Sequence, residues 1–364
     1  MSFRRLVHLV VSDMSVRRRT YSLRSIDMSH LFRRPLECPG GRPDYHPPPM
    51  EENLQEMKPS PLPAPAMSFY PPRQMEFHEG QMEFMLLGGR HNKVVATDQT
   101  GRAVLYDPDQ YAVQTLRGFA VPKSTPISFT IGGDHLYVLD VRPWPGREEQ
   151  CFECLDYQRD GDEDWYPRVL PPPPTYRYKH DPEVEDFAPS IDSYTVCGDG
   201  SRIWISEERD GTYSFDIAAA AWSKVGDWAL PFSGAAEYVP EHGAWFGLRD
   251  DDRCCVFCAV DLAAATARRP PAVRNLWKDL APPAEWTVPL TSHLVHLGSA
   301  RFCIARFFTT NPFGPDADAV YPVTHAVFTA VEVERCADAD GGLRMVKHGS
   351  KLYTLLYGMP YWVL

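Results

Sequence analysis

The stretch KVVATDQTGRAVLYD, residues 93–107, contains the plan on which the chain is built: an apolar run, a turn, a second apolar run and an acidic residue. An Asp-x-x-Gly turn between two β-rich runs predicts a β-hairpin. The same pattern recurs along the chain. The acidic residue that ends it, which we call the marker, is Asp27, Asp107, Asp156, Asp216, Asp261 or Glu332. Similar hairpins at irregular intervals indicate a fold made of repeated sheet units.

Further short runs flank most of the hairpins. One run ends in glycine before the hairpin, as in ISFTIGG (127–133), and another follows the marker, as in AVQTL from Ala112. Four antiparallel strands followed by a proline-rich exit form one blade of a β-propeller. PPPP at 171–174 and the Leu230–Pro231 exit mark blade ends, because proline cannot donate a hydrogen bond into a following central strand.

The expected fold is therefore all-β: a β-propeller of four-stranded antiparallel blades, with six blades closed by pairing of N- and C-terminal strands. The hairpin of residues 6–27 lacks outer partners. We expect the run SKLYTLLY, residues 350–357, to join it, because an open ring would expose aggregation-prone sheet edges. Five or seven blades stay open as competitors, as do a β-sandwich and two separate β domains.

The chain divides into three regions. Residues 1–34 form the N-terminal hairpin of the closing blade, and residues 74–364 supply the remaining blades and the closing strand. Residues 35–73 between them hold twelve of the 35 prolines. Such a composition cannot form a packed core, so we expect a flexible surface insertion, with a ligand for a proline-reading module as the alternative.

Composition narrows the classes of partner. The formal net charge is −11, and residues 1–36 carry eight Arg against Asp13 and Asp27, so the remainder is more acidic than the whole. An acidic body disfavours nucleic-acid binding, and no run approaches the roughly 20 apolar residues of a membrane helix. The nine Cys show no disulfide framework. We expect a monomer in the cytosol or nucleus, where thiols stay reduced.

The sequence carries no recognisable catalytic or metal motif. The pairs Cys151–Cys154 and Cys255–Cys258 have zinc-site spacing but lie in predicted strands, where residues three apart face opposite sides. We therefore expect structural thiols, with neither a metal nor a cofactor. An enzyme is the less favoured alternative, and it would need polar residues that converge on the innermost strands near the channel.

The six markers are expected to be structural, because a strand-ending carboxylate can accept backbone N–H groups of the next turn. Function is expected on the opposite side, where the turns between the second and third strands of every blade emerge together. Two of these turns, 141–150 and 308–325, are long. Long loops on a rigid scaffold often carry function, and Arg, Trp and Phe are typical of binding hot spots.

The predicted function is therefore a non-catalytic propeller scaffold that binds a protein or peptide partner through this face. Loops that merely vary in length are the structural alternative. The residues assigned to the face are Arg18, Asp98, Arg102, Arg142, Trp144, Arg147, Glu208, Arg209, Asp251, Arg253 and Phe313.

The stretches VVATDQTGRAVLYDPD, WSKVGDWALPFSGAAEYVPEHGAWFGL and LGSARFCIARFF resemble a large family of uncharacterised grass proteins, classed as a domain of unknown function. The resemblance covers the N-terminal hairpin and most of residues 80–340. It implies a propeller related to kelch and F-box-associated propellers, and it transfers no catalytic or binding residue. It also implies a third function, a substrate-recruiting adaptor for ubiquitin-dependent degradation. No F-box helix pattern precedes the propeller, so that role would need another chain.

Overall fold

The computed structural model describes residues 4–13, 19–32, 57–72, 80–89, 91–143, 146–158, 164–178, 191–251, 254–278, 288–309, 323–336, 342–355 and 358–364. Within these residues the strands form five hydrogen-bonded sheets. The helical elements there are two short 3₁₀ turns, η1 (Glu148–Gln150) and η2 (Pro174–Tyr178). The all-β prediction is confirmed.

Three sheets follow the expected plan of four consecutive antiparallel strands, and the third of them spans residues 288–355. The first contains β4 (Met82–Leu87), β5 (Lys93–Asp98), β6 (Ala103–Asp107) and β7 (Ala112–Leu116). The second contains β8 (Pro126–Ile131), β9 (His135–Asp140), β10 (Phe152–Gln158) and β11 (Asp164–Val169). In all three, chain order is also spatial order, so each strand pairs with its neighbours in the sequence.

The next sheet has eight strands, because two four-stranded runs are fused. The first run is β12 (Ser193–Val196), β13 (Arg202–Glu207), β14 (Gly211–Asp216) and β15 (Ala221–Gly226), and the second is β16 (Gly234–Val239), β17 (Ala244–Asp251), β18 (Cys254–Asp261) and β19 (Ala272–Trp277). Strands β12 and β16 pair in parallel, with Ser193 opposite Gly234. The Thr195 hydroxyl adds a 2.6 Å hydrogen bond to the Ala236 carbonyl. The sheet is therefore mixed where the two antiparallel runs meet.

A further four-stranded sheet contains β20 (Val288–Gly298), β21 (Arg301–Thr309), β22 (Thr324–Arg335) and β23 (Leu343–Leu355). The last sheet joins distant parts of the chain: β24 (Gly358–Val363), β1 (Leu6–Asp13), β2 (Thr20–Asp27) and β3 (Met67–Phe69). Its inner pair places Leu9 opposite Val363. N- and C-terminal strands therefore do pair with each other.

The strand that closes the ring is not the predicted run 350–357. Ser350–Leu355 belong to β23 and pair with Thr324–Thr329 of β22. The partner of β1 is β24, and His8 and Leu364 exchange backbone hydrogen bonds of 2.9 and 2.8 Å. Both runs are rich in residues that favour strands, so local sequence could not distinguish the outer strand of the β20–β23 sheet from the closing strand.

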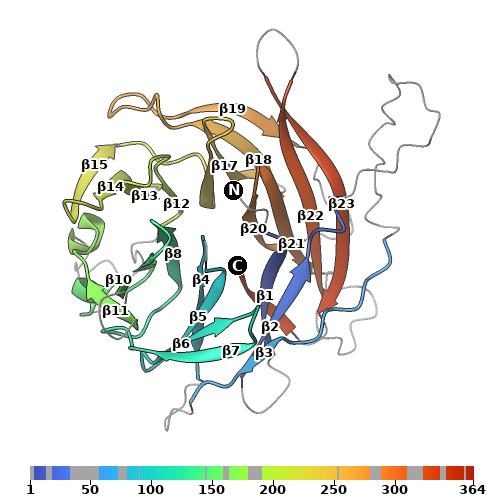
Figure 1. The fold of residues 1–364 in the computed structure, drawn as a ribbon. Coiled ribbons are helices and arrows are strands. Elements are labelled where there is room, and N and C mark those ends of the chain that lie inside the picture. Colours follow the sequence, from blue (N-terminus) through green and yellow to red (C-terminus); the bar gives the residue numbers. More distant parts are fainter. Residues whose placement is uncertain are drawn as a thin grey trace.

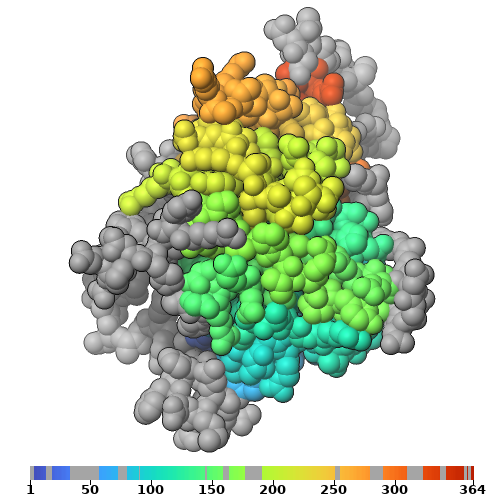
Figure 2. Space-filling model, turned by 90° about the vertical axis from the view of Figure 1, so that its left-hand side faces the viewer, coloured from blue at the N-terminus to red at the C-terminus, as the bar shows by residue number. Residues whose placement is uncertain are grey.

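The sheets surround a central axis as a β-propeller (Figure 1). The chain passes round the ring in sequence order, and the blue strands β1 and β2 lie beside the red strands β22 and β23. Strands that begin each run are innermost, and β4 contacts β8 while β16 contacts β20. From the side, the cyan, green, yellow and orange segments follow one another as one continuous surface (Figure 2). The C-terminal end of the chain lies near the centre of the view in Figure 1.

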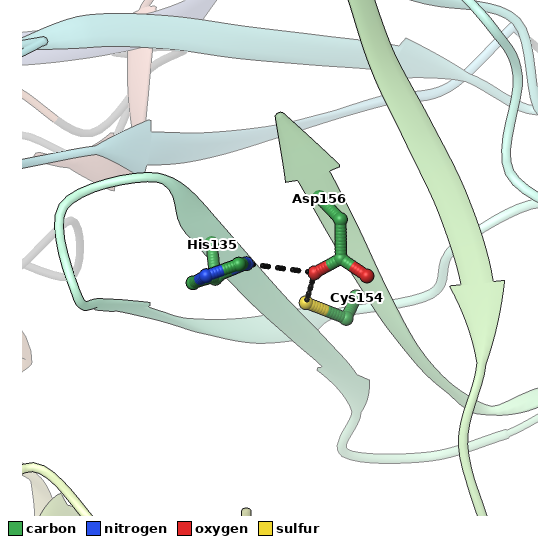
Figure 3. Close-up of side chains that lie close together, drawn as sticks. All are labelled: His135, Cys154 and Asp156. Atoms are coloured by element: carbon green, nitrogen blue, oxygen red, sulfur yellow. Dashed lines mark hydrogen bonds and ion pairs between the residues drawn. The ribbon is translucent and has the colours of Figure 1, made fainter. Parts of the chain in front are cut away.

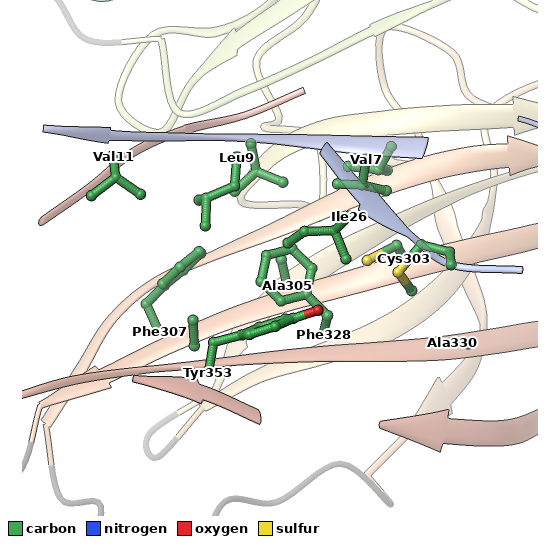
Figure 4. Packing of buried hydrophobic residues seen from close by; sticks show 14 of the residues in the cluster. Val7, Leu9, Val11, Ile26, Cys303, Ala305, Phe307, Phe328, Ala330 and Tyr353 are labelled. Carbon is green, nitrogen blue, oxygen red and sulfur yellow. The ribbon is translucent and has the colours of Figure 1, made fainter. Parts of the chain in front are cut away.

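The core lies between neighbouring sheets, as a propeller requires. Side chains of the closing sheet, including Val7, Leu9 and Ile26, meet Phe307 and Phe328 of the β20–β23 sheet (Figure 4). All five are at most 1% exposed. On its other face, the closing sheet packs against the β4–β7 sheet. The closing sheet is therefore held by apolar contacts on both sides.

Part of the proline-rich region is built into the ring. Residues 33–56 and 73–79 lie outside the described residues. In place of the expected flexible segment, Met67–Phe69 form β3, which pairs with β2 as its outer strand. Upstream, the Ser60 amide donates a 2.8 Å hydrogen bond to the Leu352 carbonyl. Leu62 packs against the apolar core between the closing sheet and the β20–β23 sheet. The N-terminal hairpin thus obtains the outer partner that the sequence analysis did not find.

Closure should be tested by the double substitution Val363→Ala and Leu364→Ala. Both side chains are less than a tenth exposed, at 8% and 9%. Their loss should lower the free energy of unfolding by about 3–6 kcal/mol, measured by chemical denaturation. Met359→Ala, on the same strand but 45% exposed, is the control and should cost under about 0.5 kcal/mol. Equal effects of the two changes would contradict a closing role for β24.

Candidate partner-binding face

Consecutive antiparallel strands reverse direction, so all connections between second and third strands emerge on one side of the ring. We call this side the turn face, and the opposite side, toward which the third strands run, the marker face. The turn face carries 99–102, 141–143, 146–151 and 208–210 among the described residues. The connections 14–18, 252–253 and 310–322 lie outside them.

The structure places five of the predicted face residues in solvent on these turns: Arg102, Arg142, Arg147, Glu208 and Arg209. Asp98 is buried, so we leave it out of the face. Asp251 is the last residue of β17, and its side chain is outside the described set. Arg18, Trp144, Arg253 and Phe313 also lie outside the described residues.

The turn after β5 explains why Asp98 is buried. Its Oδ1 atom accepts hydrogen bonds from the Thr100 amide and hydroxyl at 2.8 and 2.6 Å, and its Oδ2 atom lies 3.3 Å from Arg102 Nε. Gly101 adopts φ = +83°, a left-handed conformation that other residues rarely adopt. The carboxylate therefore shapes its own turn and pairs with Arg102, whose side chain is exposed.

The long turn 141–151 stands on a buried ionic cluster. Lys123 Nζ lies 2.6 Å from Glu153 Oε1 and 3.9 Å from Asp140 Oδ2, and all three side chains are at most 2% exposed. The same ammonium donates a 3.2 Å hydrogen bond to the Gln150 carbonyl, inside the turn. The turn is thus tied at its base to both flanking strands, while Arg142 and Arg147 project from it into solvent.

A third carboxylate extends this cluster toward the closing sheet. Glu83, on β4, is 2% exposed and accepts hydrogen bonds from Gln81 Nε2 at 2.7 Å and from Trp362 Nε1 at 3.2 Å. Its charge also acts on Asp140. Asp140 therefore feels the Lys123 ammonium together with two further carboxylates, Glu153 and Glu83. Buried like charges in such numbers favour retention of a proton on one of them.

Asp140 is a carboxyl of this cluster with a raised pKa. Burial raises its pKa to about 7, opposed by the Lys123 ammonium and by the 2.9 Å hydrogen bond from the Ser124 amide, and reinforced by Glu153 and Glu83. The base of the long turn therefore contains a group that titrates near neutral pH.

The turn between β13 and β14 is fixed differently. The Glu208 amide donates a 2.7 Å hydrogen bond to Asp192 Oδ2, and Gly211 takes φ = +90° at the start of β14. A Cβ atom on Gly211 would lie 2.3 Å from the Gly226 carbonyl oxygen, so glycine is required there. Glu208 and Arg209 are held at the tip of a short, rigid hairpin.

On the marker face, every acidic marker is matched by a basic side chain. The pairs are Arg5 Nε–Asp27 Oδ2 at 3.3 Å, Lys93 Nζ–Asp107 Oδ2 at 3.0 Å, Arg168 Nε–Asp156 Oδ2 at 2.9 Å, Arg202 Nε–Asp216 Oδ2 at 3.4 Å, Arg274 Nη2–Asp261 Oδ2 at 2.6 Å and Arg301 Nε–Glu332 Oε1 at 3.2 Å. The sequence analysis missed these bases. For three of them the sequence did contain a usable feature, a basic residue at the start of the second strand: Lys93, Arg202 and Arg301.

Four markers also hold the following turn. The Oδ1 atoms of Asp27, Asp107, Asp216 and Asp261 accept the amides of Ser29, Asp109, Ala219 and Ala263 at 2.9–3.0 Å. For Asp107, burial would raise the pKa, but the Lys93 ammonium and the Gln110 and Asp109 amides outweigh it and lower the pKa below its usual value. The marker carboxylates thus stay ionised and bound within the fold.

Three polar groups bear on the enzyme alternative, because they lie on or beside the innermost strands. Burial raises the pKa of Glu237, on β16, to about 7, with Arg4 opposing. Burial, together with the charge of Glu237, raises the pKa of Tyr194 to about 12. Arg4 Nη2 donates a 2.8 Å hydrogen bond to the Leu364 carbonyl. Acid–base catalysis works best with a pKa near the operating pH, so Glu237 is the first residue to replace in a test of the enzyme alternative.

The chain belongs to the family described as "Protein of unknown function (DUF1668)", whose sequence profile matches residues 4–353. The expected membership of a family of unknown function is confirmed. No curated protein sequence matches the chain.

Several solved structures are similar in shape to this chain, although their sequence identity to it is low. TolB from Acinetobacter baumannii has a TM-score of 0.44 and 9% identity, with 97% of this chain and 66% of that chain covered. Hydrazine synthase from Kuenenia stuttgartiensis has a TM-score of 0.40 and 11% identity, covering 72% and 65%. A chain of a nidogen/laminin complex has a TM-score of 0.37 and 10% identity, covering 75% and 96%. The chain thus spans slightly under two thirds of the length of the first two structures.

Within the described residues, no helix is both long and apolar enough to pass through a membrane.

The cluster beneath the long turn should make stability depend on pH. Because the folded pKa of Asp140 lies above its unfolded value, its contribution is present below about pH 4 and is lost as the pH rises through about 7. Asn cannot ionise, so Asp140→Asn should remove this loss. The free energy of unfolding of the variant, measured by urea denaturation, should fall less between about pH 5 and pH 8 than that of the wild type.

The control for this prediction is Glu149→Gln, which removes an exposed carboxylate from the same turn. Its pH profile should run parallel to that of the wild type. Glu237 titrates in all three proteins and cancels in the comparison. Parallel profiles for Asp140→Asn and the wild type would show that Asp140 is ionised throughout.

Proposed function

We propose that this protein is a six-bladed, non-catalytic β-propeller that binds a protein or peptide partner on its turn face. The count of six treats the two runs of the eight-stranded sheet as separate blades, because each has four antiparallel strands and its own marker. The observation that carries the binding proposal is the anchoring of turn 141–151. Lys123 and Glu153 hold its base, while Arg142 and Arg147 stand in solvent.

The physical argument concerns conformational entropy. A loop that must become ordered on binding loses affinity, whereas a loop already held by its scaffold does not. The turns at 98–102 and 207–211 are also held by internal hydrogen bonds, so Arg102, Glu208 and Arg209 are presented at fixed positions. Exposed charges of both signs on one rigid face favour a partner with complementary charge over an unselective apolar contact.

The narrower expectations from the sequence stay predictions. These are a kelch-like blade pattern, a plant source, a monomer, a location in the cytosol or nucleus, and recruitment of substrates for ubiquitin-dependent degradation. Each would specify the partner further, but none is needed for the binding proposal.

The test reverses two charges on the turn face, with Arg142→Glu and Arg147→Glu combined. Partners captured by the wild type from an extract of the source tissue are identified by mass spectrometry, and their affinities are then measured with purified proteins. If these residues are hot spots, affinity should fall by about 30-fold or more, which corresponds to about 2 kcal/mol. The melting temperature should be nearly unchanged, because both side chains are exposed.

The matched control is Arg268→Glu with Arg269→Glu. These two exposed residues lie between β18 and β19, on the marker face, and give the same change in net charge. The control variant should bind like the wild type. Loss of binding in the control with retention in the turn-face variant would assign the partner to the opposite side of the ring.

A further inference from the structure

Three potential metal ligands meet on the marker face, where β9 begins and β10 ends (Figure 3). Asp156 Oδ1 lies 2.8 Å from His135 Nδ1 and 2.9 Å from Cys154 Sγ. The three ligand atoms all lie within 4.8 Å of one another. One nitrogen, one sulfur and one oxygen therefore converge on a space the size of a single ion.

Strand geometry explains the convergence. Cys154 and Asp156 are two residues apart on β10, so their side chains point to the same face of the sheet. His135 is directly opposite Asp156 on β9, and Tyr137 is opposite Cys154. The donors are thus positioned by paired strands and not by a loop. This differs from Cys151–Cys154, the pair whose spacing in the sequence suggested a metal.

The three side chains differ in exposure, so the site is open to solvent on one side. Cys154 is buried, whereas the side chains of Asp156 and His135 are 20% and 45% exposed. An ion could enter past the histidine ring, and a water molecule could occupy the remaining position. This combination of a fixed thiol, a fixed carboxylate and an accessible imidazole resembles the three-ligand arrangement in which zinc keeps an open position.

We propose that His135, Cys154 and Asp156 form a binding site for a divalent transition-metal ion, with zinc as the best match to the donors. Zinc bonds about 2.3 Å long to sulfur and about 2.0–2.2 Å long to nitrogen and oxygen place tetrahedral ligands about 3.3–3.7 Å apart. The ligand atoms that are now hydrogen-bonded need to separate by less than about 1 Å. The half-exposed His135 ring has room for that movement.

Binding of one Zn²⁺ ion by these three side chains balances in charge and in protons. The thiol loses its proton to solvent and becomes a thiolate ligand. The imidazole binds through neutral Nδ1, so its N–H proton is carried on Nε2. Asp156 is already ionised: burial raises its pKa, but hydrogen bonds from Cys154, Arg168 and His135 outweigh this and lower it. Zn²⁺ with one thiolate and one carboxylate is neutral, and one proton is released for each ion bound.

Arg168 acts on the site from outside the ligand set. Its Nε atom donates to Asp156 Oδ2 at 2.9 Å, so it holds the carboxylate with Oδ1 turned toward Cys154 and His135. Without a metal, burial and the neighbouring Asp156 keep the pKa of Cys154 well above its usual value, so the thiol is protonated and unreactive. The metal-free cluster is therefore a stable hydrogen-bonded state of the same residues.

The equivalent positions in other sheets carry residues that do not suit a metal ion. In the same register position, opposite the marker, β5 carries Lys93, β13 carries Arg202 and β21 carries Arg301. A fixed cation repels a metal ion, whereas histidine can bind one when neutral. Two residues before Asp216 the chain has Ser214, where Asp156 has Cys154. Arg202, Ser214 and Asp216 thus form a matched arrangement that should not bind metal.

The experiment titrates metal-free protein with Co²⁺, which replaces zinc and reports thiolate ligation by a charge-transfer absorption. Zn²⁺ is then added in competition, and proton release is measured by calorimetry in buffers of different ionisation enthalpy. We expect one ion per chain, a thiolate band and about one proton released. Cys154→Ser should abolish the band. His135→Gln should weaken binding by at least about 100-fold, since even changes outside the ligand set cost 10–100-fold.

Cys258→Ser is the control, because Cys258 is a buried thiol on β18 with no histidine partner, and it should leave the band unchanged. His135 is partly exposed, so its replacement tests the site even if Cys154→Ser fails to fold. A thiolate band that persists in His135→Gln at unchanged affinity, or no band at saturating Co²⁺ in the wild type, would overturn the proposal. The site lies on the marker face, so the result is independent of partner binding.

Discussion

The pairing of β1 with β24 is the interaction on which the rest of the structure depends. It joins residues about 350 positions apart in the sequence, such as Leu9 and Val363, and so turns an open row of sheets into a ring. The closing sheet then packs against a neighbour on each side. Trp362 also reaches Glu83, at the edge of the cluster that supports the long turn. Closure and the candidate face are therefore connected through named side chains.

Within each blade, register is reinforced by charge. The acidic residue near the end of the third strand pairs with a basic residue, which starts the second strand in three blades, as with Lys93 and Asp107, and lies on the fourth strand in two others, as with Arg168 and Asp156. Exposed pairs of this kind contribute little to stability, with a median of about 0–1 kcal/mol. Their value lies in position: a slip by one residue would turn every side chain of a strand to the other face and separate the pair. The repeated charges thus favour one register.

The sequence analysis succeeded where information was local. Alternation and turn residues located the hairpins, and the markers fell on the third strand of each run. It failed where two runs compete for one strand edge: Ser350–Leu355 and Tyr361–Val363 are both rich in strand-favouring residues, and only the packing of the whole ring assigns them to β22 and β1. The turn face was predictable as a face, although nothing local showed that Asp98 would be buried in its own turn.

The cluster around Lys123 and the group around His135 also differ in how far the sequence could predict them. Lys123 is a single lysine near two prolines, and its partners Asp140 and Glu153 come from other segments, so no local pattern announces the buried pair. The group of His135, Cys154 and Asp156 was closer to being predictable. Residues two apart on a strand share a face, and the hairpin register places His135 opposite Asp156. The sequence analysis weighed the Cys-x-x-Cys spacing, expected structural thiols there, and did not consider the same-face pair Cys154 and Asp156.

The parallel join between β12 and β16 has a consequence for how the ring opens. Among the described residues, these two runs share a backbone ladder from Ser193 to Thr195, whereas the closing sheet meets the β20–β23 sheet through single backbone hydrogen bonds such as Ser60 N to Leu352 O at 2.8 Å. Local unfolding proceeds in cooperative units that follow hydrogen-bonded structure. Residues 191–278 should therefore exchange their inner-strand amide hydrogens as one unit. Local opening is then expected mainly between the other blades. The ring would therefore consist of one stiffer segment, residues 191–278, and a remainder that opens more readily.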